Sequence, residues 1–228
     1  MAASHAIVPF SSLVIAQKVA DGTQPRPQSV TAMHVLTIID HPDPDSLTHA
    51  IAQRFADGVV KAGHTSEIGD LHAEGFSPIW SKADIPVDAD NPPPADVLEQ
   101  QARIERCDAL CLVFPLFWWG MPAMLKGWVD RVWTYGWAYD DVDDPYSSLQ
   151  RKRSCVMLIP CGASPQVMAP HGYPGAMNRL WDRGTLGYFG MGNTRIEFLH
   201  GSQGSAGRRA SLLETAYQAG LAITAPQQ

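Results

Sequence analysis

Short apolar runs alternate along this chain with stretches of helical spacing. Five runs predict buried strands, of which the second is the weakest, at residues 33–39, 65–71, 109–114, 153–159 and 194–199. Between them, apolar residues recur every three or four positions, as at Leu47, Ile51, Phe55 and Val59, which is the spacing of one helix face. Strands and helices that alternate in this way indicate a parallel sheet covered by helices on both faces.

Residues at the ends of these elements indicate where the helices begin and end. Ser46 is a favoured helix N-cap, and Gly63 follows the last apolar position of the same helix. Further helices are expected from Pro122 to Val132 and over residues 95–107, 175–189 and 206–222. Five strands joined by helical crossovers predict a flavodoxin-like, doubly wound sheet with the strand order 2-1-3-4-5.

Three segments between these elements carry no regular period and are expected to be loops. Residues 73–94 contain several prolines, residues 135–150 contain an acidic cluster, and residues 160–174 are rich in glycine and proline. Long loops in compact domains are usually functional or mobile. Ligands of open α/β sheets bind at the carboxyl ends of the strands, so the loops that follow strands are the expected binding sites.

The composition favours a globular domain that acts on small molecules. The 228 residues suit one domain over residues 33–228, preceded by an extension of residues 1–32 that we expect to be disordered. The net charge of −6 argues against a nucleic-acid surface, which needs a basic face. No membrane span is expected, because no apolar stretch approaches the roughly 20 residues that cross a bilayer.

The cysteines favour a reducing compartment. Cys107, Cys111, Cys155 and Cys161 contain no CxxC pair, so buried free thiols are expected rather than disulfides or zinc ligands. Residues 6–16 are moderately apolar, but no Lys or Arg precedes them, which argues against a secretory signal. The sequence therefore predicts a cytoplasmic protein.

One segment combines a strand end, an aromatic loop and a helix start. Pro115 stops the apolar run 109–114, and residues 116–119 form a short aromatic loop that Gly120 closes. Pro122 suits the first turn of the helix that follows. A flat aromatic loop thus stands at the carboxyl end of a strand, where ligands bind.

The segment from Phe114 to Trp133 resembles the flavin-dependent NAD(P)H:quinone oxidoreductases, which carry a Phe-Pro-Leu-x-Trp-aromatic-x-x-Pro-Ala-apolar-Leu-Lys-Gly-Trp pattern. In that family the loop lies against the isoalloxazine ring. The resemblance therefore implies flavin contacts from Pro115, Leu116, Phe117, Trp118 and Trp119. Plain core packing is the alternative for these aromatic residues, and it is favoured for Trp128 and Trp133 on the helix.

The first predicted strand is also followed by a ligand signal. Free N–H groups at the start of the next helix, with the hydroxyls of Ser46 and Thr48, suit a phosphate, although a simple N-cap role for Ser46 is an equal alternative. Family members carry a His, four residues, then Ser, an apolar and a polar residue at the flavin pyrophosphate. The resemblance implies phosphate contacts from His41, Ser46, Leu47 and Thr48, with Thr48 standing where an Asn is common.

The loop after the fourth predicted strand departs most from the family, which has Thr-Thr-Gly-Gly there. The resemblance implies flavin contacts from Pro160, Cys161, Gly162 and Ala163. Gly162 allows close approach, and the N–H groups of Gly162 and Ala163 are expected to stabilise negative charge that develops near N1 and O2 of the reduced ring. The relay Tyr and His of vertebrate-type members have no clear counterparts. His171 and Tyr173 lie near enough in the sequence to substitute.

Tyr139 ends a Gly-Trp-Ala-Tyr segment that resembles a Phe-Ala-Tyr of the family. In relatives that Tyr reaches the neighbouring subunit's active site. The resemblance thus implies a homodimer with Tyr139, Trp133 and Trp137 at the partner. The acidic residues within 140–144 lack the spacing and terminal Glu of a Ca²⁺ loop, so no metal site is expected.

The resemblance implies transfer of two electrons, as hydride, from NAD(P)H through bound flavin to a quinone or a similar electron-poor aromatic. FAD is expected, with FMN as the alternative. No G-x-G-x-x-G follows the first strand, which indicates that NAD(P)H visits the acceptor's pocket and that the kinetics are ping-pong. Two alternatives stay open, a flavin-binding regulatory subunit of a transporter and a one-electron flavodoxin-type carrier.

Overall fold

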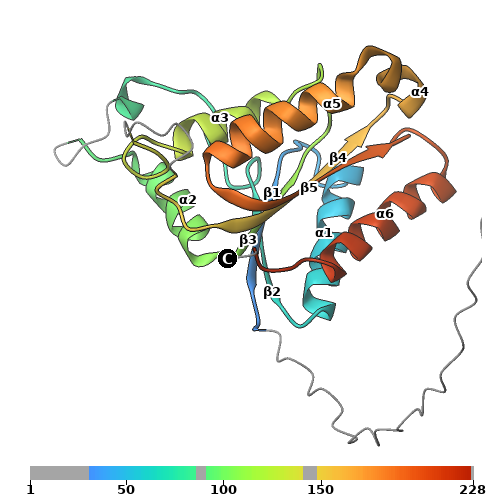
Figure 1. Cartoon of the computed structure of the whole chain (residues 1–228), viewed down its shortest axis with the longest axis horizontal. Helices are drawn as coiled ribbons and strands as arrows, with labels where there is room; N and C mark the ends of the chain where they lie inside the picture. The colour runs from blue at the N-terminus through green and yellow to red at the C-terminus, as the bar shows by residue number, and fades with distance from the viewer. Residues whose placement is uncertain (1–30, 86–90, 141–147, 227–228) are drawn as a thin grey trace, which may run out of the picture. The chain divides into compact units, whose positions relative to one another are not determined.

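The computed structural model describes residues 31–85, 91–140 and 148–226. From Ala32 onward the chain clusters as one compact unit, built on a five-stranded parallel sheet (Figure 1). The strands are β1 (His34–Ile39), β2 (Thr65–Asp70), β3 (Ala109–Val113), β4 (Arg153–Cys161) and β5 (Met191–His200). Their order, β2-β1-β3-β4-β5, confirms the predicted flavodoxin-like sheet.

The burial of each strand follows from its place in the sheet. β3 and β4 lie inside the sheet with every residue buried, as their continuous apolar runs predict. β2 is an edge strand, and its exposed Thr65 and Ile68 account for its weak apolar pattern. β5 begins at Met191, three residues earlier than predicted, because it pairs along the whole length of β4.

Helices cover both faces of the sheet, as the alternating pattern predicts. One face carries α2 (Ala95–Arg106), α3 (Ala123–Val132) and α5 (Tyr173–Asn178), and the other carries α1 (Leu47–Lys61) and α6 (Ala206–Leu221) (Figure 1). Each face has its own apolar core. Trp128 and Phe114 are buried in the first, and Phe55 and Leu212 in the second. All four cysteines are buried and free, as predicted.

Two glycines let α1 and α6 cross at close range. A Cβ atom on Gly58 would overlap the backbone carbonyl oxygen of Tyr217, and one on Gly220 would overlap that of Phe55. The two helices therefore touch backbone to backbone at this crossing. No larger residue fits either position unless the helices move apart.

The segment from 160 to 174, predicted as a loop, is partly helical. It contains α4 (Pro165–Met168) and the 3₁₀ turn η2 (Ala169–His171), and α5 begins at Tyr173, two residues earlier than predicted. Pro165 suits the first turn of α4, and Gly172 separates η2 from α5 with a φ of 68°, which favours glycine. Beyond α5 the chain continues as the π-helix η3 (Arg179–Leu186), a geometry that the apolar spacing does not reveal.

The proline-rich segment after β2 is anchored to α3 through an ion pair. Its described residues, 73–85 and 91–94, include the 3₁₀ turn η1 (Lys82–Asp84), which a reciprocal capping box between Ser81 and Asp84 closes. Asp84 accepts a hydrogen bond from Arg131 Nε at 2.8 Å, and Arg131 also pairs with Asp96 of α2. Burial and these contacts therefore fix η1 within a segment that the sequence predicts as irregular.

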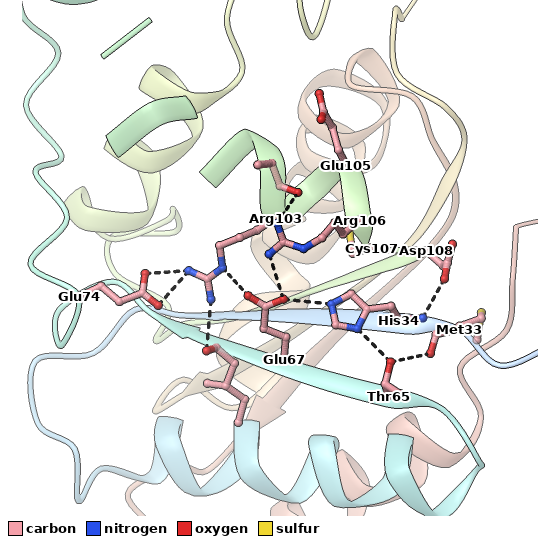
Figure 2. Close-up of polar contacts among 12 residues, drawn as sticks. Met33, His34, Thr65, Glu67, Glu74, Arg103, Glu105, Arg106, Cys107 and Asp108 are labelled. Atoms are coloured by element: carbon pink, nitrogen blue, oxygen red, sulfur yellow. Dashed lines mark hydrogen bonds and ion pairs between the residues drawn. The ribbon is translucent and has the colours of Figure 1, made fainter. Parts of the chain in front are cut away.

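A polar network joins β1, β2 and α2 (Figure 2). Arg103 of α2 donates to Glu67 at 2.7 Å and to Glu74 at 2.8 Å. Glu67 also pairs with His34 at 3.0 Å, and His34 contacts Thr65 at 2.9 Å. The network ties the edge strand β2 to the rest of the domain.

Candidate active site

Loops from four strands meet at the carboxyl edge of the sheet. Residues 40–46 follow β1, residues 114–122 follow β3, residues 162–164 follow β4 and residues 201–205 follow β5. The connections from β1 and from β2 run to opposite faces, because α1 covers one face and α2 the other (Figure 1). The direction in which successive strands are added to the sheet therefore reverses beside β1. Open α/β sheets bind ligands at such a position.

Asp40 joins the loop after β1 to the loop after β3. Its side chain is buried, and Oδ2 accepts a hydrogen bond from Leu125 N at 2.8 Å in the first turn of α3. Oδ1 lies 2.9 Å from His72 Nε2, just beyond β2. The N-cap position of α3 is Pro122, which provides no side-chain cap, so the distant Asp40 carboxylate satisfies one of the helix's free N–H groups.

The residues that the sequence assigns to phosphate lie at the start of α1 and in the loop before it. Ser46 is the N-cap of α1 and accepts from His49 N at 3.3 Å. Thr48 lies in the first turn of α1 and is 3% exposed. His41 Nδ1 accepts a hydrogen bond from Asp43 N at 3.1 Å, and Leu47 is partly buried as the first residue of α1.

A hydrogen-bonded chain runs from Ser46 to β2. His49 Nδ1 lies 2.9 Å from Ser46 Oγ, and His49 Nε2 lies 2.8 Å from Asp70 Oδ2. Ser46, His49 and Asp70 line one hollow of about 480 Å³ between α1 and β2. Burial raises the pKa of Asp70, but hydrogen bonds from His49 and from the backbone of Ala73 outweigh it, so the pKa lies below its ordinary value.

The aromatic loop after β3 is a tight turn. Phe117 and Gly120 exchange two backbone hydrogen bonds, of 3.2 and 2.9 Å, around Trp118 and Trp119. The φ angles of Trp118 and Trp119 are 47° and 61°, so the turn is of type I′ with two bulky residues in the left-handed region. This conformation costs about 1 kcal/mol or more per residue.

The turn presents its aromatic surface outward. Trp118 is 96% exposed, and Phe117 is 54% exposed. Leu116 N donates to Pro160 O at 3.0 Å, which fastens the turn to the end of β4. Pro115 and Leu116 are partly buried beneath it.

His171 and Tyr173 stand beside this turn. The Trp119 and Tyr173 rings lie 4.2 Å apart between centroids, and the Tyr173 and His171 rings lie 5.2 Å apart. The structure thus brings together two segments more than fifty residues apart in the sequence. Two of the residues expected to act in proton relay share one aromatic row with the expected flavin loop.

The loop after β4 is held by β5. His200 Nδ1 lies 2.8 Å from Ala163 O, and Ser202 N donates to Cys161 O at 3.2 Å. Arg208 Nη2 in turn donates to His200 O at 2.7 Å. Burial raises the pKa of the Cys161 thiol to about 11, although Arg208 opposes the shift, so the thiol carries its proton at neutral pH.

Gly162 leaves space at this loop that the protein itself does not fill. The residue is exposed, and a Cβ atom there would meet only the Gln203 side chain, at an ordinary 3.5 Å. The chain's own packing therefore does not require glycine. A glycine here and a flat aromatic turn on the neighbouring loop fit a planar ring that approaches the backbone closely.

Tyr139 belongs to a different aromatic group. Its ring lies 5.4 Å from Tyr188 and 5.9 Å from Tyr135 between centroids. Trp133, which the sequence places at a partner, stacks on Phe189 of the same chain at 4.0 Å. Most of the acidic cluster that follows Tyr139 falls within residues 141–147, outside the described residues.

Several site residues carry no clear sequence signal. These are Asp40, His49, Asp70, His72 and His200. Asp40 directly follows an apolar strand and His49 stands three residues after an N-cap serine, but neither position alone shows that the side chain belongs to the site. The pairing of His49 with Asp70 and of His200 with Ala163 depends on which strands are neighbours.

Over residues 31–85, 91–140 and 148–226, no three His, Cys, Asp or Glu side chains gather where they could hold a metal ion. The helices of the same residues include none whose length and apolar character would carry it across a bilayer.

Comparisons with known proteins place the chain in a family. Residues 33–221 match a family described by its flavodoxin-like fold. The solved structure of an NAD(P)H:quinone oxidoreductase from Methanothermobacter marburgensis is 34% identical, with a TM-score of 0.77 over 84% of this chain and 99% of that one. The chain belongs to the flavodoxin-like NAD(P)H:quinone oxidoreductase family.

Two curated relatives are similar to this family member over shorter stretches. An NAD(P)H dehydrogenase (quinone) 1 from Cavia porcellus is 31% identical over 68% of this chain and 64% of its own length. A ribosyldihydronicotinamide dehydrogenase-like protein from Penicillium crustosum is 34% identical over 47% of this chain and 46% of its own length. The chain therefore spans less than two thirds of the length of these two relatives.

Proposed function

We propose that this quinone-oxidoreductase family member is a flavoprotein that reduces a quinone, or a similar electron-poor aromatic, with NAD(P)H. The observation that carries the proposal is the row formed by Trp119, Tyr173 and His171 beside the exposed Trp118. It gives a planar acceptor a surface for stacking and places groups that can donate protons next to it. The net reaction consumes NAD(P)H, one proton and the quinone and yields NAD(P)⁺ and the hydroquinone.

The chain's residues suit a flavin at the carboxyl edge of the sheet. Ser46 and His41, with the N–H groups at the start of α1, would hold its phosphate. Residues 115–119 and 160–163 would hold its ring. When bound there, the flavin would supply the hydride chemistry, accepting hydride from one partner and giving it to the next.

The protein's own contribution is orientation and charge. The N–H groups of Gly162 and Ala163 would stabilise negative charge on the reduced ring, because the contact of Ala163 O with His200 fixes this loop. Trp118 would stack on the acceptor. His171 and Tyr173 would deliver the proton that the hydroquinone requires.

We further propose FAD rather than FMN, a homodimer in which Tyr139 reaches the partner, and a cytoplasmic location. FAD and the dimer rest on the family resemblance, and the location rests on four buried thiols with no disulfide among them. NAD(P)H and the acceptor would occupy one pocket in turn, since the sequence carries no separate dinucleotide motif after β1.

The first experiment is the visible spectrum of the purified protein with identification of the released cofactor. Steady-state oxidation of NADH and NADPH with a simple quinone follows, and parallel lines in double-reciprocal plots are expected. A protein that binds neither FAD nor FMN would overturn the proposal. Flavin binding without NAD(P)H oxidation would favour a regulatory subunit instead.

A further inference from the structure

Hydrogen bonds link Ser46 to His49 and His49 to Asp70. The positions of the hydrogen atoms in these bonds can be assigned from the groups that can only accept. Asp70 Oδ1 accepts hydrogen bonds from His72 N and Ala73 N, each at 3.1 Å. These contacts fix the carboxylate of Asp70 and keep it ionised, so it can only accept. The 2.8 Å contact with His49 Nε2 therefore requires a hydrogen on Nε2.

This assignment determines that the hydroxyl of Ser46 donates to His49. A neutral imidazole with its hydrogen on Nε2 has a lone pair on Nδ1, which must accept. The contact between Nδ1 and Ser46 Oγ, at 2.9 Å, is then made by the hydroxyl hydrogen of Ser46. Because Ser46 Oγ also accepts from His49 N, a ligand would meet a hydroxyl whose only hydrogen is already used.

A phosphate changes this arrangement, because phosphate oxygens accept hydrogen bonds. Ser46 can donate to a phosphate only if its hydroxyl turns away from His49. Nδ1 of His49 then loses the hydrogen bond that the hydroxyl donated. If Nδ1 takes up a proton, it can donate to Ser46 Oγ, and the contact is kept with donor and acceptor exchanged. The resulting imidazolium stays paired with Asp70 and adds a positive charge beside the phosphate.

We propose that binding of the flavin's phosphate at Ser46 is coupled to the uptake of one proton by His49. The inference rests on the proposed function, because it takes a flavin phosphate as the ligand. His49 is a positioning residue, since it acts through the hydroxyl of Ser46. Asp70 holds the imidazole in the orientation that allows the exchange.

The surroundings of His49 favour the protonated ring once phosphate is present. The titratable groups around it include Asp40 at the end of β1, Asp70 and His72 at the end of β2, and His41, Asp43 and Asp45 in the loop before α1. Asp40 is paired with His72. The ring of His41 lies 6.3 Å from that of His49 and opposes its protonation only when His41 is itself charged.

The sign of the pH dependence follows from the exchange. Where the imidazole already holds the second proton before binding, binding takes up none. Where it does not, the proton must come from solvent. Affinity therefore falls as the pH rises, with a limit of about tenfold per pH unit.

The test is calorimetric titration of FAD into the flavin-free full chain. FAD is chosen because its diphosphate is already fully ionised across the tested range, from about pH 5.5 to about pH 8.5. At pH 8, titrations in two buffers of different ionisation enthalpy give the number of protons taken up. We expect close to one proton at pH 8 and nearly none at pH 5.5.

Variants of His49 test whether it takes up the proton or whether Ser46 acts only as the helix N-cap. H49Q and H49A cannot take up the proton, so FAD binding should lose its proton uptake and most of its pH dependence. H34A is the matched control, because His34 has two side-chain contacts of similar length at the other end of the sheet (Figure 2). It should bind FAD with the wild-type proton count.

The outcomes are distinct. FAD binding by the wild type without proton uptake overturns this inference and leaves the proposed function intact, as does uptake that survives in both H49Q and H49A. Failure of the wild type to bind FAD or FMN overturns both. If H49A does not fold, H49Q alone decides. If the chain binds only FMN, the test is the difference in proton uptake between the wild type and H49Q. Protons exchanged by the FMN phosphate itself cancel in this difference.

Discussion

The Asp40 carboxylate accepts a hydrogen bond from Leu125 N, 85 residues further along the chain, at 2.8 Å. The contact holds the start of α3 against the end of β1, and the aromatic turn lies directly before that helix. The position of the turn therefore depends on a buried side chain outside the turn itself.

Removal of that carboxylate should cost both stability and cofactor affinity. Asp40→Ala leaves Leu125 N and His72 without their acceptor, and we expect a loss of about 1.5 to 3 kcal/mol in the free energy of unfolding. Asp40→Asn keeps one oxygen that can accept from Leu125 N and should lose less. Urea unfolding measures the first effect and fluorescence titration with FAD the second. Equal stability in wild type and both variants would contradict the role.

Substitutions at Trp118 should separate backbone strain from stacking. Its φ of 47° favours glycine, so Trp118→Gly should be about 1 kcal/mol more stable than Trp118→Ala. Both variants lose the exposed indole, and both should weaken acceptor binding, seen as a higher KM for the quinone. The two should retain flavin. Complete loss of flavin in either variant would show that Trp118 supports the cofactor's pocket instead of the acceptor.

The crossing of α1 and α6 should tolerate no side chain. Gly58→Ala and Gly220→Ala each force a methyl group into opposing backbone, and we expect each to cost about 2 to 3 kcal/mol in the free energy of unfolding. Gly207→Ala, in the first turn of α6, is the control, because a Cβ there meets only Ser205 Oγ, at 3.9 Å. It should be neutral or slightly stabilising. A neutral Gly220→Ala would mean that the helices are not in close contact.

Acid should destabilise the fold through several paired carboxylates. Burial raises their pKa values, but hydrogen bonds and nearby cations outweigh it, so the pKa values lie below the ordinary ones in Glu67, Asp70, Asp84 and Asp108. Their stabilisation is complete above the ordinary values of 3.8 for aspartate and 4.5 for glutamate, and is lost as the pH falls through the lowered folded-state values.

Urea unfolding at a series of pH values from about 7 to about 3 checks this expectation. The free energy of unfolding should fall steeply toward the acid end, and Asp84→Asn, with its lower starting stability, should show a shallower fall. Asp84 is a suitable choice because it pairs with the buried Arg131 at 2.8 Å. Unchanged stability down to pH 3 would show that these pairs contribute little.

The alternation of apolar runs with helical spacing predicted the parallel sheet, and five strands with helical crossovers predicted its flavodoxin-like order. Apolar burial is the largest favourable term in folding, and its period of two or of 3.6 residues is visible in the chain itself. The aromatic loop was identified in the same way, because Pro115 and Gly120 are local signals. The start of β5 was not predicted, because pairing with β4 sets it. The helical turns after β4 were not predicted either, because they depend on how a Gly/Pro-rich segment packs.

By itself, the sequence determined that five strands alternate with helices, and that an aromatic turn and a serine N-cap follow two of the strands. It did not determine the contacts of Asp40 with Leu125, of His49 with Asp70, or of Trp119 with Tyr173. Each joins segments on neighbouring strands or their loops, and hydrogen bonds and ring contacts act only over a few ångströms. Only the folded sheet, which aligns the carboxyl ends of its strands, brings these partners within that range.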